Sequence, residues 1–377
     1  MFRWLLLFPA LALVVVGCLT TFKSPDWAPW KLAVLAGEFG HGLAILAIAL
    51  GVMAWTTRGS QDVFAGAIVG VTALAAVLLL KPTFQAWRVG RGLPEKLQRQ
   101  FGHVALDRPA FSVAAFFGPA PKAVPVETFA YAADLALDFY HPVRSDARPG
   151  PCVIVVHGGG WNGGVRGEIA PLNHWLARRG YAVAAITYRL APKFTWPAQR
   201  DDILEAIAFL KAHAAALGID ATRLVLLGRS AGGNLAEATA YAAPDPAIRG
   251  VVALYAPADV NFAYACGRED DVLKSPALLR QFLGGPPESA RAAYEGASGY
   301  LHVGEFTPPT LLIHGELDTL VWHRQSERLD QKLAAAGIAH AFVSLPWATH
   351  GMEYNLSGPG GQLTTFAVEW FLGAVTK

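Results

Sequence analysis

Ser230 is the residue whose sequence context most clearly indicates chemistry. It lies between Gly228 and Gly232, after an apolar run rich in β-forming residues and before an alanine-rich stretch typical of a helix. Glycines two positions either side of a serine permit a sharp turn from strand to helix. Such a turn lifts the hydroxyl above a helix N-terminus, where amide dipoles favour developing negative charge. The pattern predicts a nucleophilic serine.

A glycine-rich segment upstream is a candidate to stabilise that negative charge. Residues 158–160 are three successive glycines, which follow an apolar run and precede Trp161. Backbone N–H groups in such a loop are uncovered and can donate to an oxyanion. We expect Gly159 and Gly160, with Ala231 after the serine, to be the donors, and Trp161 to contact the substrate. The alternatives are a flexible glycine loop and a phosphate loop, but the Gly-Lys-Ser/Thr signature of a phosphate loop is absent from this segment.

The serine also needs a base and an acid, because a hydroxyl is a poor nucleophile near neutral pH. His350 and Asp318 both follow apolar runs predicted to be strands, and the chain order is Ser, Asp, His. We expect His350 to act as the base and Asp318 to orient it. Asp259 and Glu316 remain alternatives for the acid. Three further histidines lie inside or beside predicted regular elements and are expected to be structural: His314, His323 and His340.

An alternating series of predicted strands and helices positions these residues. The strands are predicted at residues 126–131, 135–140, 152–157, 182–187, 224–228, 251–255, 310–314 and 341–345, the first two as a hairpin. The helices are predicted at residues 169–179, 201–216, 231–242, 324–336 and 363–375. This alternation predicts an α/β fold with a mostly parallel, helix-covered sheet and a site at the carboxyl ends of its strands.

Residues 261–307 separate two of these strands and are too many for a simple connection. We expect a cap over the site. Four aromatic residues in the cap are candidates to line an apolar acyl pocket, the alternative being a small core of the cap itself: Tyr264, Phe282, Tyr294 and Tyr300.

The segments at 157–161 and 228–233 resemble motifs of the α/β-hydrolase superfamily, in particular its esterase and lipase group. That group is related to hormone-sensitive lipase and to bacterial feruloyl-esterase-like (BD-FAE-like) carboxylesterases. Other matching segments are 188–192, 196–198, 218–220 and 308–315. The resemblance covers residue 126 to the end, and Arg229 departs from it, because a smaller or uncharged residue is more usual there.

The resemblance implies the Ser230, Asp318 and His350 triad, the three oxyanion donors named above, and no cofactor or metal. The leading functional hypothesis is a carboxylesterase that cleaves a small-molecule or lipid ester through an acyl-enzyme. An amidase or peptidase of the same fold is the alternative, and a non-catalytic binding protein is a third possibility.

The composition indicates a chain that is partly in lipid. Of 377 residues, 53% are hydrophobic and 16% charged, and the mean hydropathy is +0.32, which excludes a disordered chain. Lys and Arg number 31 against 29 Asp and Glu, without long basic runs, so no nucleic-acid partner is expected. The three cysteines are too few and too scattered for a disulfide framework or a metal site.

The excess hydrophobicity lies in residues 1–82, which predict two to three transmembrane helices and a multi-pass membrane location. Apolar stretches at 32–56 and 63–80 would span about 38 and 27 Å as helices, enough to cross a bilayer. The stretch at 4–19 is a further span, a signal peptide, or a lipoprotein signal ending at Cys18. Glu38 and His41 share a helix face and are expected to form a structural pair or reach the interface.

Residues 83–125 are predicted to be a juxtamembrane connector, and residues 126–377 to form the hydrolase domain. Three spans with an internal N-terminus would export this domain, whereas the basic residues after the third span favour the cytoplasm. The side of the membrane stays open, as do the oligomeric state and the ester that fits the site.

Overall fold

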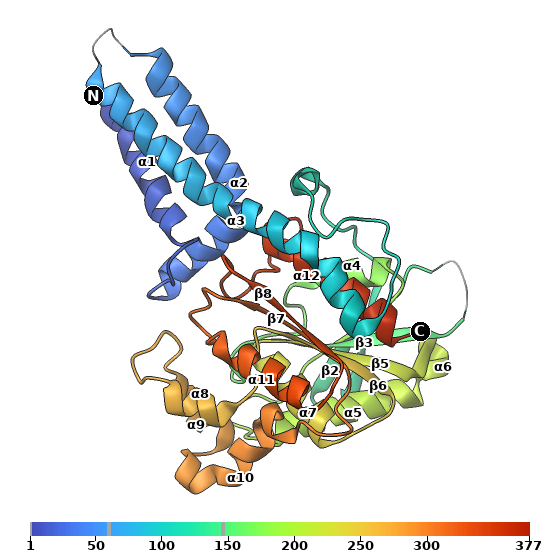
Figure 1. The fold of residues 1–377 in the computed structure, drawn as a ribbon. Coiled ribbons are helices and arrows are strands. Elements are labelled where there is room, and N and C mark those ends of the chain that lie inside the picture. Colours follow the sequence, from blue (N-terminus) through green and yellow to red (C-terminus); the bar gives the residue numbers. More distant parts are fainter. Residues whose placement is uncertain (1, 59–61, 145–147) are drawn as a thin grey trace.

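The computed structural model describes residues 2–58, 62–144 and 148–377. A bundle of three N-terminal helices projects from a layered α/β domain (Figure 1). The domain contains one sheet of eight strands in the order β1-β2-β4-β3-β5-β6-β7-β8. The strands are β1 (Val126–Ala132), β2 (Leu135–Tyr140), β3 (Gly150–Val156), β4 (Ala182–Ile186), β5 (Ile219–Arg229), β6 (Ile248–Leu254), β7 (Thr310–Gly315) and β8 (His340–Leu345).

The pairing of the strands explains where a site can form. β1 and β2 make an antiparallel hairpin, and β2 also pairs antiparallel with β4. From β4 to β8 all neighbours are parallel. The carboxyl ends of these parallel strands therefore share one edge of the sheet, and the predicted α/β fold is confirmed.

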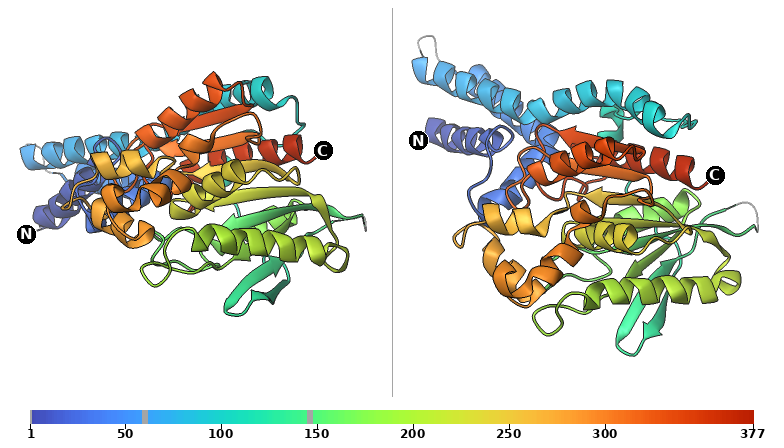
Figure 2. Two further views of the ribbon diagram at one scale, coloured as in Figure 1. Left: turned by 90° about the horizontal axis from the view of Figure 1, so that it is seen from below. Right: turned by 60° about the horizontal axis from the view of Figure 1, so that its bottom comes forward.

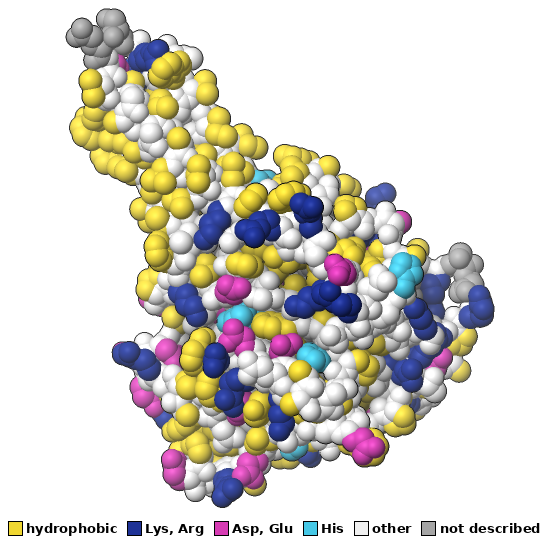
Figure 3. Space-filling view, viewed as in Figure 1, with side chains coloured by type: hydrophobic (Ala, Val, Ile, Leu, Met, Phe, Trp, Pro, Cys, Tyr) yellow, Lys and Arg dark blue, Asp and Glu magenta, His cyan; other side chains and the backbone are white. Residues whose placement is uncertain are grey.

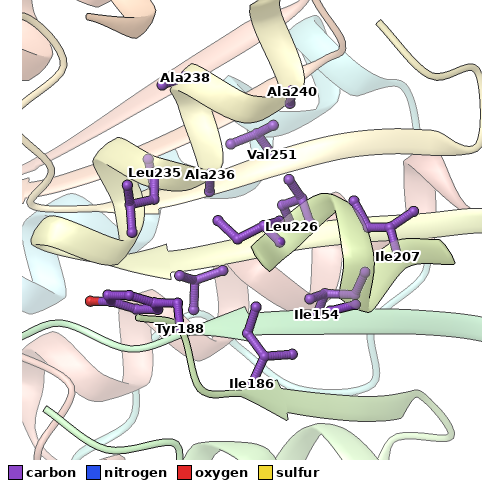
Figure 4. Close-up of a cluster of buried hydrophobic side chains, with 14 of the residues drawn as sticks. Ile154, Ile186, Tyr188, Ile207, Leu226, Leu235, Ala236, Ala238, Ala240 and Val251 are labelled. Atoms are coloured by element: carbon purple, nitrogen blue, oxygen red, sulfur yellow. The ribbon is translucent and has the colours of Figure 1, made fainter. Parts of the chain in front are cut away.

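Helices cover both faces because alternate side chains of each buried strand point to opposite sides. Ile154 of β3 belongs to one buried apolar cluster and its neighbour Val153 to another. The first face carries α5 (Ala198–Ala212), α7 (Ala231–Ala242) and α11 (Arg324–Ala335), and the second carries α4 (Ala170–Arg178) and α12 (Pro359–Val375). Figure 2 shows this layering from two further directions, and Figure 4 shows part of the first cluster between the sheet, α5 and α7. The four-residue helix α6 (Ala214–Leu217) leads into β5.

The N-terminal bundle consists of α1 (Phe2–Cys18), α2 (Trp27–Thr56) and α3 (Val63–Phe101). Small residues bring α2 close to α3: a Cβ on Gly40 would lie 2.5 Å from the carbonyl oxygen of Leu79, and one on Gly51 would lie 2.5 Å from Thr72 Oγ1. α2 and α3 are long and apolar enough to cross a membrane, whereas α1 is a shorter apolar helix.

α3 differs from the expected arrangement, because it continues without interruption through the first part of the predicted connector. Its later turns carry Ala86, Leu93 and Leu97, which are buried in the second apolar cluster of the sheet. This packing, at helical spacing, stabilises the helix past Pro82 and Pro94. The junction expected near residue 82 therefore falls inside a helix, and the core of the α/β domain includes residues well before 126.

The cap predicted between β6 and β7 is helical. It contains α8 (Val260–Cys266), α9 (Ser275–Leu283), α10 (Pro287–Ala297) and the short 3-10 helix η2 (Gly299–His302). Another short 3-10 helix, η1 (Val113–Phe117), lies in the segment between α3 and β1.

Candidate active site

Ser230 lies at a strained turn between β5 and α7. Its φ of +52° and ψ of −122° are rare for a residue with a side chain. The turn requires glycine on both sides, since a Cβ on Gly228 would lie 2.1 Å from the carbonyl oxygen of Gly232, and one on Gly232 would lie 2.2 Å from that of Val156. The close approaches explain the glycine spacing, and they are the steric reason for which the turn was predicted from the sequence.

His350 and Asp318, which follow β8 and β7, come together at the sheet edge. Nδ1 of His350 lies 2.7 Å from Oδ2 of Asp318, and the other carboxylate oxygen accepts hydrogen bonds from the backbone N–H groups of Leu320 and Val321 at 2.8 and 3.0 Å. A carboxylate at Nδ1 fixes the imidazole orientation and leaves Nε2 available as a proton acceptor.

A second histidine contacts the same carboxylate. Nε2 of His314 lies 3.1 Å from Oδ2 of Asp318, and its Nδ1 lies 2.8 Å from Oγ of Ser326. Burial acts to raise the pKa of Asp318, but the charge of His350 and the hydrogen bonds from both histidines outweigh it and hold the pKa well below its ordinary value. His314 was predicted to be structural, and its contact with Asp318 was not predicted; the four-residue spacing between the two was the available signal.

The two alternative acids lie in other interactions. Asp259 accepts a hydrogen bond from the backbone N–H of Phe262 at the start of α8 and pairs with Arg328 at 2.9 Å. Glu316 accepts a hydrogen bond of 2.6 Å from the hydroxyl of Ser344. In the part of the chain that the structure describes, neither carboxylate is bonded to His350.

The glycine loop after β3 lies beside Ser230. Gly159 and Gly160 have φ values of +105° and +60°, and a Cβ on Gly159 would lie 2.4 Å from the carbonyl oxygen of Gly163. With Ala231, they line a cavity of about 940 Å³ that Ser230 and His350 also line. The structure thus brings together all six residues predicted for the triad and the oxyanion donors.

The three predicted substrate-binding residues have different positions. Trp161 lines the cavity, stacks on Phe282 with ring centroids 4.5 Å apart, and donates to Asn234 Oδ1 at 3.2 Å. Tyr264 and Tyr294 are not among the residues that line it. Tyr294 is fully buried and packs edge-on against Tyr264 at 5.6 Å. The prediction that these two tyrosines line the pocket is therefore corrected: they contact each other between α8 and α10 and belong to, or pack against, the apolar cluster on the first face of the sheet.

Arg229, which replaces the smaller or uncharged residue expected before Ser230, has a partner far along the chain. Its Nε lies 3.1 Å from Oε1 of Glu353, and both side chains are almost completely buried. The hydroxyl of Tyr255 donates to the same oxygen, and the Tyr255 ring lies 4.2 Å from the ring of His350. Burial and the charge of Glu353 raise the pKa of Tyr255, so this hydroxyl stays protonated. Neither Tyr255 nor Glu353 was a sequence candidate.

Residues from the N-terminal bundle also line the cavity, which the sequence did not indicate. They lie at the connection from α1 to α2 and in the first turn of α2: Pro25, Asp26, Trp27 and Trp30.

The expected pair of Glu38 and His41 does not form. Glu38 accepts a hydrogen bond of 2.8 Å from the backbone N–H of Gly360 in the first turn of α12, whereas the ring of His41 stacks on Phe116 at 3.9 Å. Packing of α2 against the α/β domain brings each side chain to a different partner.

Comparison with known proteins agrees with the fold. The model of the BD-FAE family matches residues 137–333, about half of the chain. A probable carboxylic ester hydrolase, LipM of Mycobacterium tuberculosis, is 30% identical over 60% of this chain and 54% of its own length. An ethyl acetate hydrolase of Pseudomonas putida is 31% identical over 57% of this chain and 70% of its own length.

Among solved structures, a bacterial heroin esterase superposes with a TM-score of 0.57 at 26% identity, covering 70% of this chain and 86% of that protein. The fold and the matches define an α/β-hydrolase of the esterase and lipase group. Within that group, the chain belongs to the BD-FAE family. The matched part of the chain spans about half the length of LipM.

Proposed function

We propose that the protein is a serine carboxylesterase anchored to a membrane by its N-terminal helices. The observation that carries the proposal is the 2.7 Å contact of His350 Nδ1 with Asp318, in a cavity that Ser230 also lines. The names of the relatives, an ester hydrolase and an ethyl acetate hydrolase, support an ester as substrate.

The mechanism follows from the positions of these groups. Oγ of Ser230 attacks the ester carbonyl while Nε2 of His350 accepts its proton, and the backbone N–H groups of Gly159, Gly160 and Ala231 stabilise the oxyanion. Collapse of the tetrahedral intermediate expels the alcohol, which takes the proton from His350. A water molecule then gives a proton to His350 and attacks the acyl-enzyme, which releases the acid and restores the serine.

The surface of the bundle supports the anchor. Apolar side chains cover the projecting helices, and Lys and Arg side chains gather where the bundle meets the α/β domain (Figure 3). Exposed large hydrophobic residues occur on all three helices, among them Phe8, Ile45, Ile48, Leu74 and Val77. A water-exposed apolar surface of this kind is unfavourable, and a bilayer would cover it.

Labelling with a fluorophosphonate tests the enzyme assignment, because only an activated serine reacts. The wild-type protein should be labelled at Ser230 and should hydrolyse p-nitrophenyl esters, and Ser230→Ala should lose both properties while keeping its melting temperature. Matched p-nitroanilide amides separate an esterase from an amidase. A well-folded wild-type protein with neither labelling nor turnover would refute the proposal.

A further inference from the structure

The N-terminal bundle forms part of the cavity wall, and the proposed reaction gives this part of the wall no role. We define the α1–α2 corner as Pro25, Asp26, Trp27 and Trp30, all of which line the same cavity as Ser230 and His350. These residues precede the family match by more than a hundred positions. They are therefore a feature of this chain and not of the matched hydrolase region.

The corner and the next turns of α2 lie beside the loop that carries His350. A Cβ placed on Gly351, the residue after His350, would lie 3.9 Å from the Trp30 ring, and one placed on Gly37 in α2 would lie 3.6 Å from the Trp347 ring. At the next residue of α2, the backbone oxygen of Glu38 accepts a hydrogen bond of 3.0 Å from the side chain of Asn355. α2 therefore lies along this loop from Trp30 to Glu38, which is more than two turns of helix.

The corner also marks one end of the apolar surface of the bundle. Nζ of Lys81 in α3 lies 2.8 Å from the backbone oxygen of Thr20, which places the middle of α3 beside the corner. Exposed aromatic side chains occur at this end, at Phe22, Trp27, Phe84 and Trp87.

The opposite end of the bundle carries a second group of exposed aromatic residues, Trp4, Trp55 and Phe64. From Phe64 to Phe84 the helix rises by about 30 Å, the thickness of a bilayer hydrocarbon core. Trp and Tyr side chains concentrate at both membrane–water interfaces. The corner, and with it this side of the cavity, therefore lies at the level of a membrane interface.

The cavity that the corner lines is larger than a neighbouring cavity beside the cap. Its apolar lining includes Leu273, Leu320 and Val321, which also line the smaller cavity on the cap side. The smaller cavity, of about 200 Å³, lies among Phe262, Leu279 and Trp322. The larger cavity, which the corner lines, has room for a long alkyl chain of a substrate. The smaller cavity has room for a short substituent.

We infer that the α1–α2 corner is a subsite for the alkyl chain of an amphiphilic ester, which reaches Ser230 from the bilayer surface without passing through bulk water. The inference rests on the proposed esterase function and names its substrate class. Trp27 and Trp30 contact the chain, and the carbonyl lies at Ser230.

The test uses the full-length protein in phosphatidylcholine vesicles. For each variant, kcat/KM is measured for vesicle-embedded p-nitrophenyl laurate and for soluble p-nitrophenyl acetate, and their ratio is compared with that of the wild type. Trp27→Ala and Trp30→Ala should each lower the ratio by about tenfold, because an indole supplies a large apolar contact. Trp27→Phe should restore most of it.

Trp87→Ala is the matched control. Trp87 is an exposed tryptophan at the same end of the bundle, 46% accessible, and it is not among the residues lining the cavity. Its substitution should leave the ratio within twofold of wild type. An unchanged ratio in Trp27→Ala and Trp30→Ala, or an equal fall in Trp87→Ala, would overturn the inference, since the corner would then serve attachment alone.

A second measurement locates the chain directly. A long-chain alkyl fluorophosphonate with a terminal diazirine is attached to Ser230 and photolysed, and the cross-linked peptide is identified by mass spectrometry. Cross-links within residues 22–31 support the inference, whereas cross-links confined to α8 and α9 contradict it. Failure of the esterase function itself is recognised separately, by the absence of both phosphonate labelling and acetate hydrolysis, and it also overturns the inference.

Discussion

The buried pair of Arg229 and Glu353, next to the turn at Ser230, allows a quantitative prediction of thermal stability. Both side chains are at most 2% exposed, and Nε of Arg229 lies 3.1 Å from Oε1 of Glu353. In the part of the chain that the structure describes, the two terminal nitrogens of Arg229 have no hydrogen-bond partner. Glu353 is therefore the carboxylate that compensates this buried cation.

Removing one member leaves the other charge buried without compensation, which costs about 3–5 kcal/mol. For a domain of this size each kcal/mol lowers the melting temperature by roughly 2–4 °C, so Arg229→Met and Glu353→Leu should each lower it by about 6–20 °C. The double variant replaces the pair with apolar groups and should recover most of the loss. A residual cost of about 1–3 kcal/mol is expected, because the Tyr255 hydroxyl loses its acceptor.

The assay is thermal unfolding of the full-length protein in detergent, followed by intrinsic tryptophan fluorescence, for wild type, both single variants and the double variant. Arg223→Met is a matched control, since Arg223 forms a more exposed ion pair with Asp220 and should change the melting temperature by only a few degrees. The reasoning would be refuted if the single variants behaved like this control, or if their losses simply added in the double variant.

Three further outcomes are expected. Asp318→Asn should lower kcat for p-nitrophenyl acetate by about 10³–10⁴-fold because the imidazole loses its orienting carboxylate. Asp259→Asn should change kcat by less than threefold in the same assay. The reverse order of the two effects would show that Asp259 is the acid. The pKa of Asp318 is lowered on folding from its ordinary value of 3.8, so its stabilising contribution is complete above that value and is lost as the pH falls further. The melting temperature of wild type should accordingly fall more steeply below about pH 4 than that of Asp318→Asn, and parallel slopes would contradict the shift. Glu38→Ala removes the acceptor of the Gly360 N–H group and should cost about 1–3 kcal/mol; thermal unfolding checks this, and an unchanged melting temperature would argue against a structural role for the contact.

Local rules in the sequence were enough to predict the turn at Ser230. The spacing of Gly228 and Gly232 around Ser230 follows from steric limits that act within a few residues, so it is readable without a structure. Asp318 and His350 could be placed because both follow predicted strands, and parallel strands end at one edge of a sheet. The strand and helix series followed from the alternation of apolar runs with amphipathic stretches.

The sequence left other features open because they depend on contacts between distant segments. Tyr264 and Tyr294 could equally have faced a substrate or each other, and only the packing of the cap helices brought them together. The partner of Arg229 lies 124 residues away, and no periodicity connects the two positions.

The N-terminal bundle is the clearest example of a feature that the sequence left open. Hydropathy identified α2 and α3 as candidate spans, but an apolar helix has the same hydropathy whether it faces lipid or protein. Only the tertiary structure placed the later turns of α3 in the core of the sheet and the first turn of α2 in the wall of the cavity that Ser230 and His350 line. The physical reason is that burial on a second surface is a property of the assembled fold, whereas the turn at Ser230 is fixed by its immediate neighbours.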